Sequence, residues 1–249
     1  HEEGKYLYGI IGTNEERNLG PIGIGGQEVE TIACRGLSAV ISNAPLARCV
    51  VSKETLLAHE RVLEQVMKEF TVLPVRFCTV AANAEEIRRL LERRNRELKH
   101  LLRDLDGKVE LGVKALWRNI DFIFQEIVDE NEAIKRLKAE VSEPPARQTH
   151  AQRIAIGQMV QAALEAKKER EGGELLRGLK RLSVDHRLNR TIGDKMLLNA
   201  AFLVDRAREK EFDDLMERLS LQYRARIKFA YVGPAPPYNF VNLTLHADE

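Results

Sequence analysis

The sequence predicts an α+β protein with two domains. Its 249 residues suffice for one large or two ordinary domains, and 44% of them are hydrophobic, which is enough to build a core. Short β-rich segments bounded by glycine or proline alternate with segments whose apolar residues recur at helical spacing. This pattern starts again near Gly107, after a long charged helix, so we place the domain boundary there.

The first predicted domain, residues 1–106, begins with strands and ends in that charged helix. We expect strands at 5–12, 29–36 and 37–45, a loop at 18–27, helices at 53–70 and 83–106, and an extended segment at 71–80. Arg35-Gly36 predicts the turn between the second and third strands, and Pro74 predicts a break in the extended segment. Ser52 predicts the start of the first helix, because its hydroxyl can accept from a free backbone N–H. The apolar face of that helix is expected to hold Leu56, His59, Val62, Leu63, Val66, Met67 and Phe70.

The second predicted domain, residues 107–233, has the order strand, helix, strand, strand, helix, strand. We expect strands at 109–117, 179–190, 195–206 and 224–233, and helices at 149–179, capped by Thr149, and at 209–222. Residues 119–148 are charged and interrupted by Pro144-Pro145, which predicts a variable helical insertion. The βαββαβ order is that of a ferredoxin-like fold.

The C-terminal residues 234–249 predict a stiff, extended strap. Three prolines, Pro234, Pro236 and Pro237, remove backbone donors, so the segment can be neither a helix nor a central strand. We expect Gly233 to end the last strand. Tyr238, Phe240 and Val241 then supply apolar anchors, and our hypothesis is that the strap folds back over the other domain.

Composition excludes several classes of protein. The 39 basic and 38 acidic residues nearly cancel, whereas a nucleic-acid-binding protein usually has a basic excess. No apolar run approaches the roughly 20 residues that span a bilayer. Residues 1–10 lack the pattern of a signal peptide. We therefore expect no membrane association. Cys34, Cys49 and Cys78 are odd in number and form no CxxC pair. A disulfide framework or zinc site is therefore not expected, and we expect a reduced, cytoplasmic protein.

No motif predicts a catalytic, cofactor or metal site. The glycine-rich segment 20–28 has Glu28 where a dinucleotide fingerprint needs glycine, and no P-loop follows. His59-Glu60 resembles half of an HExxH zinc motif, but Leu63 occupies the place of the second histidine, so His59 is expected to pack in the core. Asp185-His186 are neighbours on a predicted strand, where adjacent side chains face opposite sides.

Arg76 is the unusual residue of the segment 71–80. It stands in an apolar run before Phe77, and a buried arginine must find a carboxylate or backbone carbonyls. Arg76 and Phe77 can therefore form either a structural clamp or an interface anchor, and the sequence leaves both open.

Four stretches together resemble the gas vesicle protein F/L family. They are the helix and "VLPVRFCT" strand within 59–80, "ELGVKALW" at 110–117, "LLNAAFLVDRAREKEF" at 197–212 and "GPAPPYNFVNL" at 233–243. Cys78 stands where the family commonly has glycine, and Ala235 where it usually has tryptophan. The matches are in order and span most of the chain.

The resemblance implies a non-enzymatic accessory or minor structural protein of gas vesicle assembly, with two α+β domains, the second a modified ferredoxin-like one. The implied partners are the major shell protein and other gas vesicle proteins, bound through the helices and the C-terminal segment in the cytoplasm or on the vesicle. The alternative is a ferredoxin-like small-molecule-binding protein or enzyme with a site between the domains. An RNA-binding sheet is less favoured, because 224–233 lacks the glycine-rich RNP1 pattern.

Overall fold

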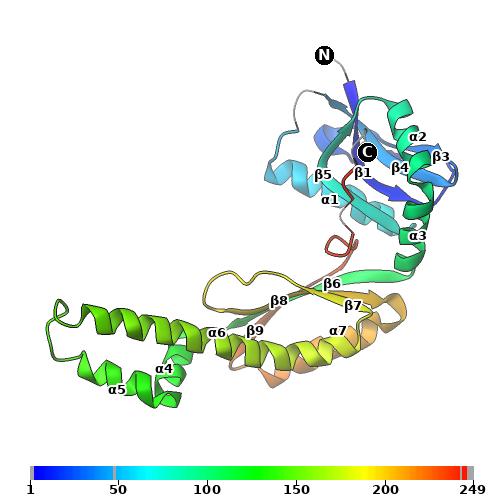
Figure 1. Ribbon diagram of the computed structural model, residues 1–249. Helices are drawn as coiled ribbons and strands as arrows, with labels where there is room; N and C mark the ends of the chain where they lie inside the picture. The colour runs from blue at the N-terminus through cyan, green and yellow to red at the C-terminus, as the bar shows by residue number, and fades with distance from the viewer. Residues whose placement is uncertain (1–2, 47–48, 242, 246–249) are drawn as a thin grey trace. The chain divides into compact units, whose positions relative to one another are not determined.

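The structure, a computed structural model, describes residues 3–46, 49–241 and 243–245. The contacts divide the chain into two compact units. Unit 1 comprises residues 1–110 together with residues 233–249, and unit 2 comprises residues 111–232. Both units combine helices and a β-sheet (Figure 1). The C-terminal segment therefore belongs to the same unit as the N-terminal strands.

Unit 1 is built on a five-stranded sheet in the order β2-β3-β4-β1-β5. Its strands are β1 (Glu3–Ile11), β2 (Asn18–Gly20), β3 (Val29–Cys34), β4 (Leu37–Pro45) and β5 (Val72–Ala81), with a short 3-10 turn, η1 (Ile24–Gly26), after β2. The turn predicted at Arg35-Gly36 is confirmed. Both residues have positive φ, 49° and 82°, as a tight two-residue hairpin requires.

Three helices pack on this sheet: α1 (Lys53–Met67), α2 (Ala84–Arg93) and α3 (Asn95–Leu105). The Ser52 cap is confirmed, because its Oγ accepts from the Thr55 N–H at 3.1 Å while Thr55 Oγ1 accepts from the Ser52 N–H at 3.0 Å. The single helix predicted at 83–106 is wrong, since the chain leaves helical geometry at Arg94 (φ −100°, ψ 17°). The break lets α2 pack on β3 and β4 while α3 packs on β5.

Unit 2 contains a four-stranded sheet in the order β7-β8-β6-β9. Its elements, in chain order, are β6 (Lys108–Trp117), α4 (Ile120–Glu130), α5 (Glu132–Glu140), α6 (His150–Arg181), β7 (Asp185–Leu188), β8 (Met196–Asp205), η2 (Arg206–Arg208), α7 (Glu209–Gln222) and β9 (Ile227–Ala235). In Figure 1 the first part of α6 runs beside α4 and α5, and its later part lies against the sheet.

Several sequence expectations for unit 2 are corrected. The strand predicted at 179–190 is reduced to β7, because α6 continues to Arg181. Thr149 stands at the start of α6, but its hydroxyl makes no capping bond. It accepts from Arg153 Nε at 2.9 Å instead. β9 continues past Gly233 to Ala235, which a proline permits because β9 lies at the edge of the sheet.

Candidate interaction site

Four of the five residues singled out in the sequence line one small hollow in unit 1. The hollow has a volume of about 150 Å³ and lies between α1, β5 and the C-terminal segment. Arg76, Phe77, Tyr238 and Val241 line it. Sequence reasoning missed the other lining residues, which are Leu56, His59, Glu60, Pro74 and Val75. The fifth predicted residue, Phe240, is half-buried and lies in the turn that begins at Pro237, to whose carbonyl it donates at 3.0 Å.

An irregularity in β5 creates one wall of the hollow. Leu7 pairs with Thr79, and Gly9 pairs with Pro74. The step from Leu7 to Gly9 covers two positions of β1, whereas the matching step from Thr79 to Pro74 covers five positions of β5. The extra residues, Val75 to Cys78, leave the ladder as a bulge. Pro74 has no N–H to give to the ladder, and Cys78 has φ 69°, which turns the chain back towards β1. The bulge places Arg76 and Phe77 outside the regular sheet.

A buried hydrogen-bonded chain holds the bulge in place. The Cys78 N–H donates to the Tyr6 hydroxyl at 3.1 Å, and that hydroxyl lies 2.9 Å from His59 Nδ1. His59 also hydrogen-bonds to the backbone of Val75, so its ring links both ends of the bulge. His59 is only 3% exposed, and burial lowers its pKa to about 4. The expectation that His59 packs in the core is confirmed, and the ring is neutral at neutral pH.

Arg76 is exposed, so the premise of a buried arginine is wrong. Its backbone N–H donates to the Leu243 carbonyl at 3.0 Å, which joins the C-terminal segment to the outer edge of β5. Within residues 3–46, 49–241 and 243–245, no carboxylate lies within ion-pair distance of its guanidinium. The cation at the rim of the hollow is thus available to an external group.

The C-terminal segment is anchored by a buried carboxylate. Glu110 accepts from the Asn239 N–H at 2.8 Å and from Asn239 Nδ2 at 2.9 Å. Burial raises the pKa of Glu110, and the two bonds from Asn239 oppose that rise. Val241 is only 8% exposed, so the C-terminal segment is as buried at this residue as the residues of the hydrophobic core.

Tyr238 lines the hollow but keeps its hydroxyl buried. Its oxygen is buried, yet no hydrogen-bond partner lies within reach in the described part of the chain. Burial, followed by the carboxylates of Glu60, Glu64 and Glu110, raises the pKa of Tyr238, so the hydroxyl keeps its proton and can donate it. Leaving a buried polar group unpaired typically costs about 1–3 kcal/mol.

The cysteines contradict the sequence-based expectation. Cys49 and Cys78 form a disulfide with a Cα–Cα distance of 5.5 Å, whereas Cys34 is free and half-buried. The expectation failed because the two residues are 29 positions apart and meet only where the β5 bulge faces the start of α1.

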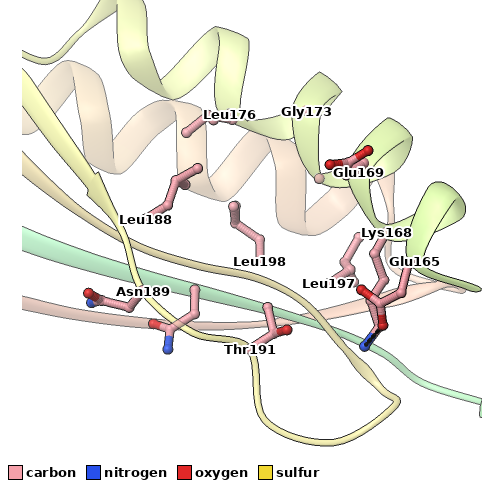
Figure 2. A pocket seen from close by; sticks show the side chains of 12 residues that line it. Glu165, Lys168, Glu169, Gly173, Leu176, Leu188, Asn189, Thr191, Leu197 and Leu198 are labelled. Atoms are coloured by element: carbon pink, nitrogen blue, oxygen red, sulfur yellow. Dashed lines mark ion pairs between the residues drawn. The ribbon is translucent and has the colours of Figure 1, made fainter.

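A second hollow, of about 260 Å³, lies within unit 2 between α6 and the β7–β8 hairpin (Figure 2). Leu176, Leu188 and Leu198 project into it from these elements. The charged Lys168 is engaged within the unit, because its Nζ donates to the Gly193 carbonyl at 3.0 Å. The hollow is therefore mainly apolar.

A charged cluster in unit 2 was also missed by sequence reasoning. Arg226 donates to Glu126 at 2.7 and 2.9 Å and to Glu171 at 2.7 and 2.9 Å, and Lys167 pairs with Glu126 at 3.2 Å. Trp117 Nε1 donates to Glu171 at 3.2 Å. These bonds join α4, α6 and the residue before β9. They engage Arg226 inside the unit, so a role in binding RNA phosphates is not supported.

The comparisons with known proteins decide the family. A model of the gas vesicle synthesis proteins GvpL/GvpF matches residues 4–242. The chain belongs to the GvpL/GvpF family. Gas vesicle protein F1 of Halobacterium salinarum is 28% identical over 99% of this chain and 97% of its own length. Gas vesicle protein L of a Streptomyces species is 32% identical over 75% of this chain and 68% of its own.

A solved structure supports the same assignment at the level of fold. The crystal structure of GvpF from Anabaena superposes with a TM-score of 0.85 at 27% identity, covering 98% of this chain and all of that one. Within the part of the GvpL/GvpF chain described above, no helix has both the length and the apolar character that a bilayer crossing needs.

Proposed function

We propose that this GvpL/GvpF protein is a non-enzymatic accessory or minor structural protein of gas vesicle assembly, and that it binds the major shell protein and other gas vesicle proteins. The family match and the relatives named gas vesicle proteins F and L support a role connected with gas vesicles. The observation that carries the binding role is the hollow beside the β5 bulge, where the exposed Arg76 lies among the apolar lining residues Leu56, Phe77 and Val241.

The chemistry of this hollow suits a protein segment. Leu56, Phe77 and Val241 supply an apolar lining, and Leu56 is 42% exposed. A partner's apolar side chain would bury this surface, at about 25 cal/mol per Å² of apolar area. A partner carboxylate beside it would pair with Arg76.

The size of the hollows favours protein contact over the small-molecule alternative. Pockets for small ligands usually have volumes of about 300–1,000 Å³. The hollow beside the bulge measures about 150 Å³, which suits a single side chain. The hollow under α6 measures about 260 Å³, and a third, lined by Tyr6, Cys49 and Val80, measures about 290 Å³, so all three lie below that range. His59, the residue of the first hollow that resembles a catalytic group, is hydrogen-bonded to Tyr6, and Tyr6 in turn is bonded to the bulge.

We further propose that the two units are domains, with residues 234–249 as a strap belonging to the first. The order β7-β8-β6-β9 supports a modified ferredoxin-like fold for the second, in which α4 and α5 form the variable insertion near 119–148. We place the protein in the cytoplasm, associated with forming vesicles, without cofactor or metal.

Co-purification with the major shell protein tests the binding role. The tagged chain is expressed with the shell protein, and retained shell protein is measured for wild type, Arg76→Glu, Leu56→Asp and Arg61→Glu. We expect the first two variants to retain roughly tenfold less, because each removes a central contact worth about 1–2 kcal/mol. Arg61→Glu is the matched control, since Arg61 is an exposed arginine of α1 that does not line the hollow.

Two results would contradict the proposal. Failure of wild type to retain shell protein would remove the proposed partner. Equal retention by wild type, Arg76→Glu and Leu56→Asp would move the contact to another surface. Circular dichroism spectra matching wild type establish that each variant is folded.

A further inference from the structure

The Cys49–Cys78 disulfide joins two parts of unit 1 that the sheet does not pair. Cys49 lies in the connection between β4 and α1, and Cys78 ends the bulge of β5. The bond closes a loop that contains all of α1. It therefore ties the entrance of this helix to the strand segment that carries Arg76 and Phe77.

The backbone at Cys78 is shaped by the bulge as well as by the sulfur. Its φ of 69° lies in the left-handed region, which favours glycine. Its N–H donates to Tyr6, a residue of β1 that is 2% exposed. Because the bulge and the Tyr6 bond both belong to the sheet, the position of Cys78 is set by interactions that persist without the disulfide. The position of Cys49 has no equivalent support from strand pairing.

Neither cysteine of the disulfide is fully buried. Cys49 and Cys78 are each half-buried. Cys49 also lines a separate hollow of about 290 Å³, together with Val50 from the connection before α1, Thr55 from the first turn of α1 and Tyr6 from β1. Val50 and Val51, which follow Cys49, are 67% and 77% exposed. The disulfide thus lies where an apolar surface, a hollow and the β5 bulge meet.

We propose that Cys49 and Cys78 form a thiol–disulfide exchange site that controls how firmly the entrance of α1 is held to β5. A dithiol reductant attacks the bond, forms a mixed disulfide with one cysteine and then closes its own disulfide. Cys49 and Cys78 are left as two thiols, and the dithiol has lost two electrons and two protons. In the reduced protein the connection before α1 is released from the bulge, while the β1–β5 pairing remains.

The inference is independent of the proposed function, because it concerns the redox state of one segment and not its binding partner. Cys34 provides an internal reference. It lies at the end of β3, half-buried and outside the disulfide.

Counting thiols tests whether the bond forms. Protein equilibrated in a buffer of reduced and oxidised glutathione is freed of glutathione, denatured, alkylated with iodoacetamide and weighed by mass spectrometry. We expect one label without reductant, on Cys34, and three after dithiothreitol. Three labels in both samples would overturn the proposal. A disulfide that includes Cys34 would overturn it as well.

Thermal melting of wild type, Cys78→Gly and Cys34→Ser tests the consequence of reduction. We expect dithiothreitol to lower the Tm of wild type and of Cys34→Ser by on the order of 10 °C, because a loop of this length loses its cross-link. Cys78→Gly should melt at one temperature with or without dithiothreitol. That temperature should be at or above the Tm of reduced wild type, since glycine accepts the positive φ. If dithiothreitol leaves the Tm of wild type unchanged, the proposal that the Cys49–Cys78 disulfide holds this segment is contradicted.

Hydrogen exchange locates the released segment. We expect amides in residues 49–56 to exchange several-fold faster in reduced wild type and in Cys49→Ser than in oxidised wild type. Amides of β8, in unit 2, should be unchanged. Equal exchange rates of the residue 49–56 amides in both redox states would show that the Cys49–Cys78 disulfide does not restrain this segment.

Discussion

At the scale of single residues, the polar groups of the site are arranged around His59. The histidine was recognised in the sequence as a packed residue because its metal motif is incomplete. Its second role, bonding Tyr6 and bracing the β5 bulge, depends on a contact 53 positions away and has no local signal. The same holds for Arg226, whose carboxylates are 100 and 55 positions distant. Sequence patterns identify residue types, but such pairs exist only in the folded chain.

The buried His59 predicts a pH dependence of stability. Burial lowers the pKa of His59 from 6.5 to about 4. Between these pH values the histidine is protonated in the unfolded chain and neutral in the folded chain. The contribution of the neutral His59 ring to the free energy of unfolding is fully present above pH 6.5. It is lost as the pH falls from 6.5 to 4. It amounts to about 3 kcal/mol at 1.36 kcal/mol per pKa unit.

Urea unfolding between pH 4 and 7.5 measures this effect. In His59→Gln, which keeps polar groups but does not titrate, the decline of the unfolding free energy over that window should be smaller by about that amount. Parallel profiles for wild type and His59→Gln would show that His59 does not carry the dependence.

At the scale of elements, short-range signals found most helices and strands, and long-range pairing decided the rest. Ser52 marks the start of α1, and helical spacing located α7 without error. Leu56 was assigned to the apolar face of α1, yet it is 42% exposed and lines the candidate site. The β5 bulge could not be foreseen, because it is defined against β1. Leu56 is thus an uncovered apolar residue at the proposed contact surface.

The glycines of α6 give a prediction at this scale. A Cβ at Gly172 would lie 2.7 Å from the Leu197 carbonyl oxygen, whereas Gly157 and Gly173 have nothing within 4 Å of that position. Gly172→Ala should therefore destabilise unit 2 through a backbone clash. Gly157→Ala and Gly173→Ala should each raise the unfolding free energy by about 0.5–1 kcal/mol, because alanine is the better helix former.

Urea titrations of the three alanine variants provide the measurement. Opposite signs at the adjacent positions 172 and 173 are the expected outcome. Stabilisation by Gly172→Ala would mean that α6 does not approach β8 as closely as the structure shows.

At the scale of the whole molecule, the family could be recognised from sequence because its characteristic stretches are linear. The GPAPPYNFVNL segment is one of them, and its residues Tyr238 and Val241 meet the β5 bulge within unit 1. The hypothesis that this strap folds back over the other domain, the first one, agrees with its grouping with unit 1, although no sequence pattern identified its contacts there. Sequence order alone does not reveal which unit a terminal segment joins, since the deciding bonds, from Asn239 to Glu110, are non-local.

The central claim is that this protein is needed for gas vesicle assembly through its interaction site. Its gene is deleted in a vesicle-forming host that still makes the shell protein, and vesicles are counted by electron microscopy after complementation. We predict no vesicles in the deletion strain, full recovery with wild type or Arg61→Glu, and little recovery with Arg76→Glu or Leu56→Asp. Normal vesicle numbers in the deletion strain, with shell protein at its usual level, would contradict the account.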